Sequence, residues 1–247
     1  MDLAPGAPLA LAFLIGMWHA LDADHVAAVA ALLGDGGGPR RALRSGVAWG
    51  AGHALVLAAA GALILVLRLS VPERTTLILE ALVGIMLAGL GVRAILLALR
   101  TRLHAHEHAH HGVPHAHWHA HLEAGSPAAL HLPHPEAPHA HPHSAGDLLR
   151  AILVGGMHGL AGSAGAALLA LAAVPTIAGG IVYLILFGAG SIVGMGVVSL
   201  VVGAPLAVAR RRYPPVYRWL STAAGLASLV VGAFIAWEAG VGRGLFA

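Results

Sequence analysis

The sequence predicts an all-α integral membrane protein with six transmembrane helices. Of its 247 residues, 58% are hydrophobic and only 10% are charged, whereas soluble domains carry about 25% charged residues. The mean hydropathy is +0.80, and the hydrophobic residues gather in runs of the roughly 20 residues that cross a bilayer. Because the chain has no cysteine, disulfides, thiolate metal sites and thiol catalysis are excluded.

Six apolar runs have the required length, and proline or arginine marks the joins between them. The runs cover residues 9–33, 45–69, 75–99, 148–172, 177–203 and 216–240. The first run follows an N-terminus without the positive charges of a signal peptide, so we expect it to be retained as a span. The chain then divides into a first three-helix half over 1–100, a histidine-rich segment over 101–147 and a second three-helix half over 148–247.

The histidine-rich segment holds fourteen of the eighteen histidines, set among Pro, Ala and Gly. Such a composition cannot bury a core, so we expect a disordered loop. Its repeated H-x-H spacing would bind transition metals weakly at several places and buffer them beside a pore, or the segment is a linker with incidental affinity. It indicates metal handling and says nothing about direction.

The distribution of arginine predicts the orientation in the membrane. With the N-terminus outside, ten arginines fall on the inner side and three, Arg68, Arg74 and Arg243, on the outer side. We therefore expect both termini outside and the histidine-rich loop in the cytoplasm, in the cytoplasmic (inner) membrane of a bacterium. The arginines lie in short segments between apolar runs, so the partner they indicate is the lipid bilayer and not nucleic acid.

A faint internal repeat relates the two halves. "HALDADHVAAVAALL" at His19 resembles "HGLAGSAGAALLALA" at His158, and "WGAGHAL" at Trp49 matches "FGAGSIV" at Phe187, with offsets of 139 and 138 residues. Three spans per half place the halves in opposite orientations. This inverted 3+3 repeat is a layout of many transporters, whose sites lie near the midplane.

The stretch "HALDADH" places two aspartates and two histidines inside an apolar run. On an ideal helix His19, Asp22 and His25 lie within an arc of about 120° and share a face. Asp24 points elsewhere, so it is either a ligand on an irregular helix or a group that orients a ligand histidine. A purely structural role, in which the two aspartates only stiffen the bundle, is a poor explanation of their presence, because each aspartate costs about 2.5–3.5 kcal/mol at mid-membrane. We therefore expect the face with His19, Asp22 and His25 to provide direct metal ligands, because imidazole and carboxylate together suit nickel, cobalt, zinc or copper.

Four further polar residues lie in other predicted spans. His53 and His158 are expected to complete or relay the metal site, although a histidine at either position could instead hydrogen-bond across the bundle. Glu80 either couples protons, or provides a charge at the mouth of the pathway, or reaches the interface. Glu238 is expected at the interface.

The match at His19, Ala20, Asp22, Ala23, Asp24 and His25 resembles the signature of the nickel/cobalt transporter family, H-A-x-D-A-D-H in an early membrane helix. "GMHGLAGSAG" around His158 resembles the second-half motif of shorter six-span relatives in this superfamily, including urease-accessory permeases. The resemblance implies a Ni²⁺ and/or Co²⁺ permease whose motif residues handle the metal. It also implies a metallochaperone or the maturation system of a urease or hydrogenase as partner. Classical members resemble eight-span proteins, and the long histidine-rich loop resembles efflux members.

The sequence therefore predicts a secondary permease for Ni²⁺ and/or Co²⁺, working in uptake, with efflux as the alternative. The metal is cargo and not a cofactor, and no enzymatic activity is expected. No G-x₄-G-K-[ST] motif indicates ATP coupling within the chain. A membrane metalloenzyme would need an open metal position and a substrate cleft, and H-E-x-x-H is missing. A metal sensor or store built on the histidine-rich loop is the remaining alternative.

Overall fold

The computed structural model describes residues 7–33, 38–110, 113–122, 145–174 and 176–246. Within these ranges the chain forms seven α-helices, one two-stranded hairpin and a terminal π-helical turn. In chain order they are α1 (Ala7–His19), α2 (Ala23–Leu33), α3 (Pro39–Leu67), α4 (Glu73–Arg100), β1 (Thr101–His110), β2 (Val113–Leu122), α5 (Ala145–Ala173), α6 (Ile177–Arg212), α7 (Pro214–Trp237) and η1 (Glu238–Gly242).

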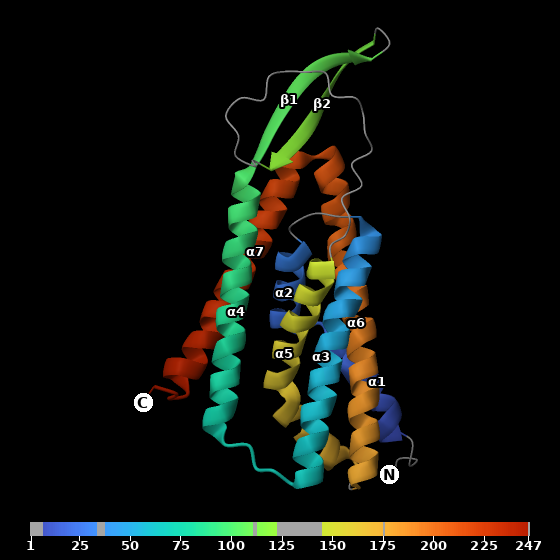
Figure 1. Ribbon diagram of the computed structural model, residues 1–247, viewed down its shortest axis with the longest axis vertical. Coiled ribbons are helices and arrows are strands. Elements are labelled where there is room, and N and C mark those ends of the chain that lie inside the picture. The colour runs from blue at the N-terminus through green and yellow to red at the C-terminus, as the bar shows by residue number, and fades with distance from the viewer. Residues whose placement is uncertain (1–6, 34–37, 111–112, 123–144, 175, 247) are drawn as a thin grey trace.

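The helices form an elongated bundle of two groups (Figure 1). In one group α3 packs along both α5 and α6, and α1 packs against α6; in the other, α4 packs along α7. The short helix α2 joins the groups because it contacts α4, α6 and α7. Where they meet, a buried cluster that includes Ala28, Trp49, Leu87 and Met195 forms the central core.

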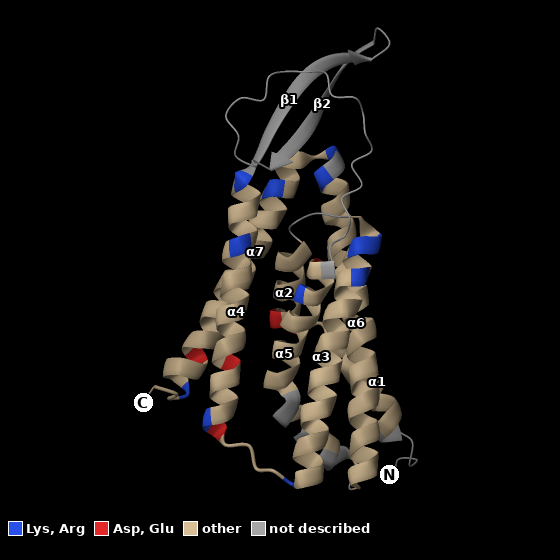
Figure 2. Cartoon of the chain, in the orientation of Figure 1, with Lys and Arg blue, Asp and Glu red and all other residues tan. Residues whose placement is uncertain are grey.

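Charged residues lie mainly at the two ends of the bundle. Figure 2 shows most of the blue arginine ribbon at the end that carries the hairpin, and little of it at the end where both termini lie. The middle section is mostly tan and therefore carries few Lys, Arg, Asp or Glu residues. This distribution is the one that the positive-inside rule associates with a cytoplasmic and an external face.

In the part of the chain that the structure describes, four helical stretches are long and apolar enough to cross a membrane: Pro39–Leu67, Glu73–Arg100, Ile177–Arg210 and Pro214–Gly242. The chain is therefore a helical membrane protein, but the predicted count of six spans is not confirmed. The fourth predicted span lies on α5, which has 29 residues. Several side chains of α5 are outside the described part of the chain, and α5 is not among the four stretches. The first predicted span is wrong as a single helix.

That first span is broken between His19 and Ala23. Its two parts, α1 and α2, have 13 and 11 residues, and a helix of 13 residues is only about 20 Å long. The amide of Asp22 donates to the carbonyl oxygen of His19 over 3.1 Å, which closes a tight turn. The run looks continuous by hydropathy because its flanks are apolar. A broken helix is tolerated at membrane depth where its free backbone groups face a cavity.

The histidine-rich segment also differs from the expectation. In place of a wholly disordered loop over 101–147, β1 and β2 pair antiparallel, with Thr101 opposite Leu122. The physical reason is that H-x-H repeats have the two-residue period of a strand. Of the rest of the predicted loop, residues 111–112 and 123–144 lie outside the described residues, and residues 145–147 form the start of α5.

Glycines bring the helices of the larger group into backbone contact. A Cβ added at Gly16 would meet the carbonyl oxygen of Phe187, and a Cβ at Gly155 would meet that of Trp49. These two contacts are related by the offsets of the sequence repeat, because Gly155 is the counterpart of Gly16 and Phe187 that of Trp49. The α1–α6 and α3–α5 contacts therefore have matching geometry.

Glycines also bring α4 and α7, the helices of the second group, into backbone contact. A Cβ at Gly84 would lie 2.6 Å from the carbonyl oxygen of Gly232, and a Cβ at Gly91 would lie 2.5 Å from that of Gly225. Gly225 follows Gly84 by 141 residues, and Gly232 follows Gly91 by the same number. Each contact is therefore the counterpart of the other under one offset. Helices α4 and α7 thus cross through two reciprocal glycine pairs, as expected for elements that face each other across a two-fold axis.

These contacts predict that glycine-to-alanine substitutions differ widely in their effect on the stability of the protein. A Cβ at Gly52 would meet the carbonyl oxygen of Ile152, and its counterpart at Gly190 would meet that of Phe13. We expect Gly52→Ala and Gly190→Ala each to destabilise the protein by about 1–3 kcal/mol, because backbone must move to admit the methyl group. Thermal unfolding of the purified protein in detergent measures the effect.

Gly89→Ala in α4 is the matched control, since a Cβ there meets nothing within 4 Å. Its unfolding midpoint should equal or exceed that of the unchanged protein, because alanine is the better helix former. Equal losses at Gly89 and Gly52 would contradict the close-packing argument.

Candidate metal-binding site

The break between α1 and α2 brings two acid–histidine pairs together. His19 is the last residue of α1, and its Nδ1 donates to Oδ2 of Asp22 over 2.7 Å. His25 lies in the first turn of α2, and its Nδ1 donates to Oδ1 of Asp24 over 2.9 Å. Among the described residues neither histidine has a hydrogen-bond partner at its buried Nε2. A carboxylate that holds Nδ1 and leaves Nε2 available is the arrangement of metal-ligating histidines.

The third imidazole, that of His53, comes from α3. Its side chain is fully buried, and neither ring nitrogen has a hydrogen-bond partner within the described structure. The ring centroid of His53 lies 5.4 Å from that of His19 and 5.2 Å from that of His25. One nitrogen from each of the three rings lies within 4.8 Å of the others. Burying such polar groups unpaired is costly, and a shared cation would remove that cost.

A fourth histidine joins the site through Asp24. The Nε2 of His158, on α5, donates to Oδ2 of Asp24 over 2.8 Å, and the rings of His158 and His25 lie 4.6 Å apart. Asp24, His25 and His158 also offer ligand atoms within 4.8 Å of one another. The Asp24 carboxylate therefore links two histidines from helices that are far apart in the sequence.

The structure brings all six predicted site residues together, but not in the predicted geometry. The prediction that His19, Asp22 and His25 share one face of a continuous helix is wrong, because the helix ends at His19. Asp24, predicted either as a ligand on an irregular helix or as a group that orients a ligand histidine, lies between His25 and His158 with 27% of its side chain exposed. Asp22 lies behind His19 with 49% of its side chain exposed.

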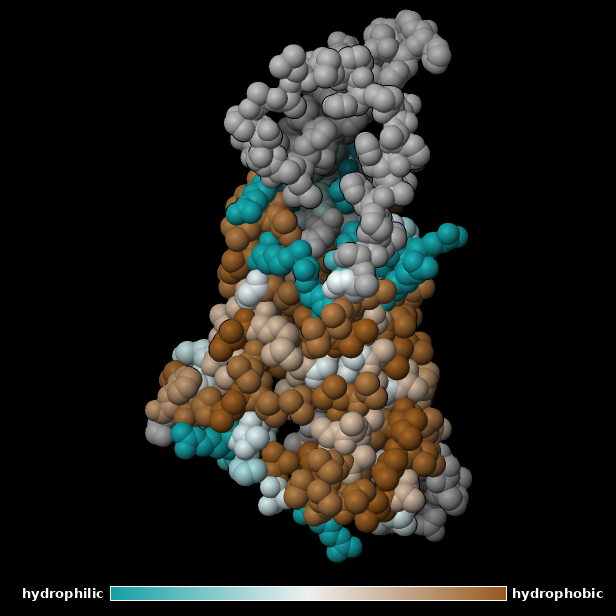
Figure 3. Space-filling view, in the orientation of Figure 1, coloured by the Kyte–Doolittle hydropathy of each residue, from teal (hydrophilic) through white to brown (hydrophobic). Residues whose placement is uncertain are grey.

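The histidines open onto a cavity of about 300 Å³. One wall carries the imidazoles and Asp24. The opposite wall comes from the α4 and α7 group and contributes two carboxylates, which belong to Glu80 and Glu238. Figure 3 shows the surface hollowed between these two groups of helices, with pale, more polar atoms beside the opening. The residues that line the cavity are His19, Asp24, His25, His53, Glu80, Val83, His158, Ala161, Gly162, Ile235 and Glu238.

Comparison with known proteins gives one informative match. The chain is 30% identical over 238 residues to the urease accessory protein UreH of Bacillus sp. (strain TB-90), and the match covers 96% of this chain and 94% of the relative. The chain belongs to the UreH family. No family model matches it, and no solved structure matches it.

Two aromatic side chains of this UreH-family site were not predicted. Trp49 is buried, and its ring lies 5.9 Å from that of His158 at an interplanar angle of 87°. Phe187 lies 5.3 Å from His19. The two aromatics occupy matching positions of the internal repeat, as do His19 and His158. The repeat could therefore have identified them, because each aromatic packs against the histidine of its partner half.

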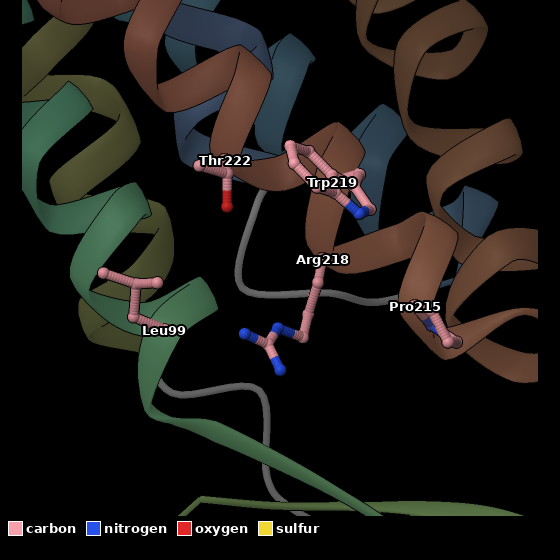
Figure 4. Close-up of a pocket in the computed structure, with 5 residues that line it drawn as sticks. All are labelled: Leu99, Pro215, Arg218, Trp219 and Thr222. Atoms are coloured by element: carbon pink, nitrogen blue, oxygen red, sulfur yellow. The ribbon is translucent and has the colours of Figure 1, made fainter.

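A larger hollow of about 420 Å³ lies away from the histidines, at the arginine-rich end between α4 and α7. Figure 4 shows that Arg218 points into it, beside the apolar side chains of Leu99, Pro215 and Trp219. Its described lining residues include no carboxylate and no imidazole. Among the described lining residues the charged one, Arg218, is positive. These residues do not suit a metal cation, so the histidine cavity is the candidate site of this UreH relative.

Proposed function

We propose that the chain is a secondary permease that carries Ni²⁺ and/or Co²⁺ across the bacterial cytoplasmic membrane, in the direction of uptake. The observation that carries this proposal is the cluster of His19, His25 and His53. It holds the buried imidazoles of His25 and His53 and the partly buried imidazole of His19. Two of the three rings are oriented by carboxylates, in the middle of a bundle of apolar helices. Such groups are expensive at membrane depth and mark ion pathways.

The ligand chemistry supports nickel and cobalt as cargo. Imidazole nitrogens favour late first-row transition metals, whereas Mg²⁺ and Ca²⁺ prefer oxygen ligands. A nitrogen–metal distance of about 2.0–2.1 Å places two donors of one ion about 3–4 Å apart. The observed limit of 4.8 Å therefore requires only a small closure of the three rings. The resemblance of "HALDADH" to nickel/cobalt transporters and membership of the UreH family agree with this cargo.

The matched glycine contacts support an inverted 3+3 repeat as the transport machinery. In such repeats one half rocks against the other around a fixed site. The histidine cavity extends toward Glu80 and Glu238, whereas the arginine-rich end is closed by an ion pair of 3.0 Å between Arg41 and Asp147. The hollow that this ion pair lines has a volume of only about 30 Å³. The larger hollow at the same end, between α4 and α7, shares no described lining residue with the histidine cavity. With the arginine-rich end in the cytoplasm, this conformation faces outward.

The partner class follows from the relative. UreH is named as a urease accessory protein, and a metal permease would serve urease by supplying metal to its maturation system or to a metallochaperone. Efflux is the alternative direction, because the histidine-rich segment would also buffer metal that is to leave the cell.

The test is radiolabelled Ni²⁺ and Co²⁺ flux into proteoliposomes of known protein orientation, with His25→Ala beside the unchanged protein. We expect saturable flux of both ions that excess Mg²⁺ does not inhibit and that His25→Ala abolishes. A folded protein that binds metal stoichiometrically without moving it would overturn the permease in favour of a sensor or a metalloenzyme. Flux only from the side of the arginine-rich end would favour efflux.

Deleting residues 104–143 separates the permease from a metal store built on the histidine-rich segment. We expect the shortened protein to retain saturable Ni²⁺ flux, reduced by less than about 10-fold, because the cluster on α1, α2 and α3 is left in place and only local metal concentration falls. Total bound nickel should decrease by several ions per chain, as measured by equilibrium dialysis. If the deletion abolishes flux while His25→Ala leaves it unchanged, the segment and not the bundle is the functional part.

A further inference from the structure

Two carboxylates lie on the wall of the cavity that faces the histidines. Glu80 lies on α4 and Glu238 begins η1, and both side chains line the same cavity as His25 and His53. They lie toward the arginine-poor end of the bundle, since α4 begins and η1 ends there (Figure 1). A cation that reaches the histidines through this cavity therefore passes two carboxylates first.

An independent observation connects these carboxylates to a cation. His53 is fully buried and lines the cavity, and both of its ring nitrogens are without a hydrogen-bond partner among the described residues. The deep end of the cavity thus presents unpaired nitrogen donors. The shallow end presents oxygen donors, which suit an ion that still holds part of its water shell.

Arg243 forms an ion pair with one of the two carboxylates, that of Glu80. Its Nη1 donates to Oε2 of Glu80 over 2.6 Å, with 39% and 31% of the two side chains exposed. A pair exposed to this extent contributes little to folding. Arg243 follows directly on η1, and its backbone N–H donates to the carbonyl oxygen of Glu238 over 2.7 Å. π-Helical turns are rare and frequently occur at functional sites.

We infer that Glu80 and Glu238 form an outer binding site for the divalent cation, and that Arg243 closes this site by holding Glu80 until the cation replaces it. The inference rests on the proposed transport function and adds the first step of the pathway. The arriving cation takes the place of the Arg243 guanidinium at Glu80, and Glu238 supplies the second carboxylate. The ion then moves through the cavity to His25 and His53 as its water shell is replaced by imidazole.

The inference is tested by the concentration dependence of Ni²⁺ flux in proteoliposomes. Glu80→Gln should raise KM about 10-fold or more and leave the maximal rate within about 2-fold, because it removes electrostatic attraction at the mouth and leaves the histidines intact. Arg243→Gln should act in the opposite direction and lower KM, because Glu80 is then available to the cation. Glu73→Gln is the matched control: it removes an acid from the first turn of α4 that does not line the cavity, and its KM should not change.

A merely structural ion pair gives a different pattern. In that case Glu80→Gln and Arg243→Gln would lower the maximal rate alike and leave KM unchanged, and the outer site would be refuted. If Glu80→Gln does not fold, Glu80→Asp replaces it. The retained carboxylate should keep KM below that of Glu80→Ala, and equal KM values for the two variants would refute the site. Absence of flux in the unchanged protein would instead reject the proposed function itself, so the two failures are distinguishable.

Discussion

Replacing His53 with alanine should lower the rate of Ni²⁺ transport more than about 100-fold. Loss of a group that only orients a ligand costs about 10–100-fold in metal affinity, and His53 is positioned to be a ligand itself. Its two ring nitrogens have no hydrogen-bond partner within the described residues, and one of them lies within 4.8 Å of nitrogens from His19 and His25. Initial rates in proteoliposomes measure the loss.

The same variant should be as stable as the unchanged protein when no metal is present. Within the described structure His53 makes no hydrogen bond that the substitution would break, and its removal takes an unpaired polar group out of the interior. Nickel at about 100 times its dissociation constant should stabilise the unchanged protein by about 2.7 kcal/mol. This metal-induced rise in the unfolding midpoint should be missing from His53→Ala.

Ser191→Ala is the matched control for His53→Ala. Ser191 occupies the equivalent position in the second half and is also fully buried. Its hydroxyl is satisfied, because it donates to the carbonyl oxygen of Phe187 over 3.0 Å on its own helix. We expect Ser191→Ala to transport Ni²⁺ at nearly the unchanged rate. If both variants lose flux equally, packing in the interior and not metal ligation explains the effect.

The residues of this site were predictable because buried charge is exceptional in an apolar chain. Histidine and aspartate within runs otherwise suited to lipid identify His19, Asp24, His25, His53 and His158 without any knowledge of tertiary structure. The internal repeat adds that His19 and His158 come from corresponding positions in opposite halves. Composition and spacing thus predict which residues meet.

How these residues meet could not be predicted in the same way. The turn that follows His19 is made of residues that a helix also accepts, so hydropathy gives no sign of the break. The break exchanges the expected places of the two aspartates relative to the site, because it turns Asp24 toward His158 and leaves Asp22 half exposed. The opposite wall, with Glu80, depends on how α4 and α7 cross through reciprocal glycine pairs, and this is a tertiary contact that no local pattern specifies.

The exchanged places of the two aspartates lead to the second prediction of a large effect. Asp24→Asn should lower Ni²⁺ affinity and flux by about 10–100-fold. The Asp24 carboxylate accepts hydrogen bonds from the backbone N–H and the Nδ1 of His25, each over 2.9 Å, and from Nε2 of His158 over 2.8 Å. An asparagine has only one acceptor oxygen, and its amide group donates. It cannot hold both imidazoles in their present orientation, and the negative charge beside the cation is lost.

Asp22→Asn should have a smaller effect, of about 10-fold or less. Asp22 makes a hydrogen bond to the Nδ1 of His19, which the amide oxygen of asparagine can still accept, and such a bond is worth about 1 kcal/mol. Its side chain is nearly twice as exposed as that of Asp24, at 49% against 27%, so solvent screens the charge that the substitution removes.

Isothermal titration of Ni²⁺ into each variant, together with initial flux rates, decides between two accounts of the motif. If Asp24→Asn is the more damaging, the broken helix is the working geometry, and Asp24 orients His25 while it joins the two halves of the bundle through His158. If Asp22→Asn is the more damaging, Asp22 is a ligand, as the continuous-helix prediction requires. The order of the two effects therefore tests the break in the first span, because only the break exchanges the positions of the two carboxylates.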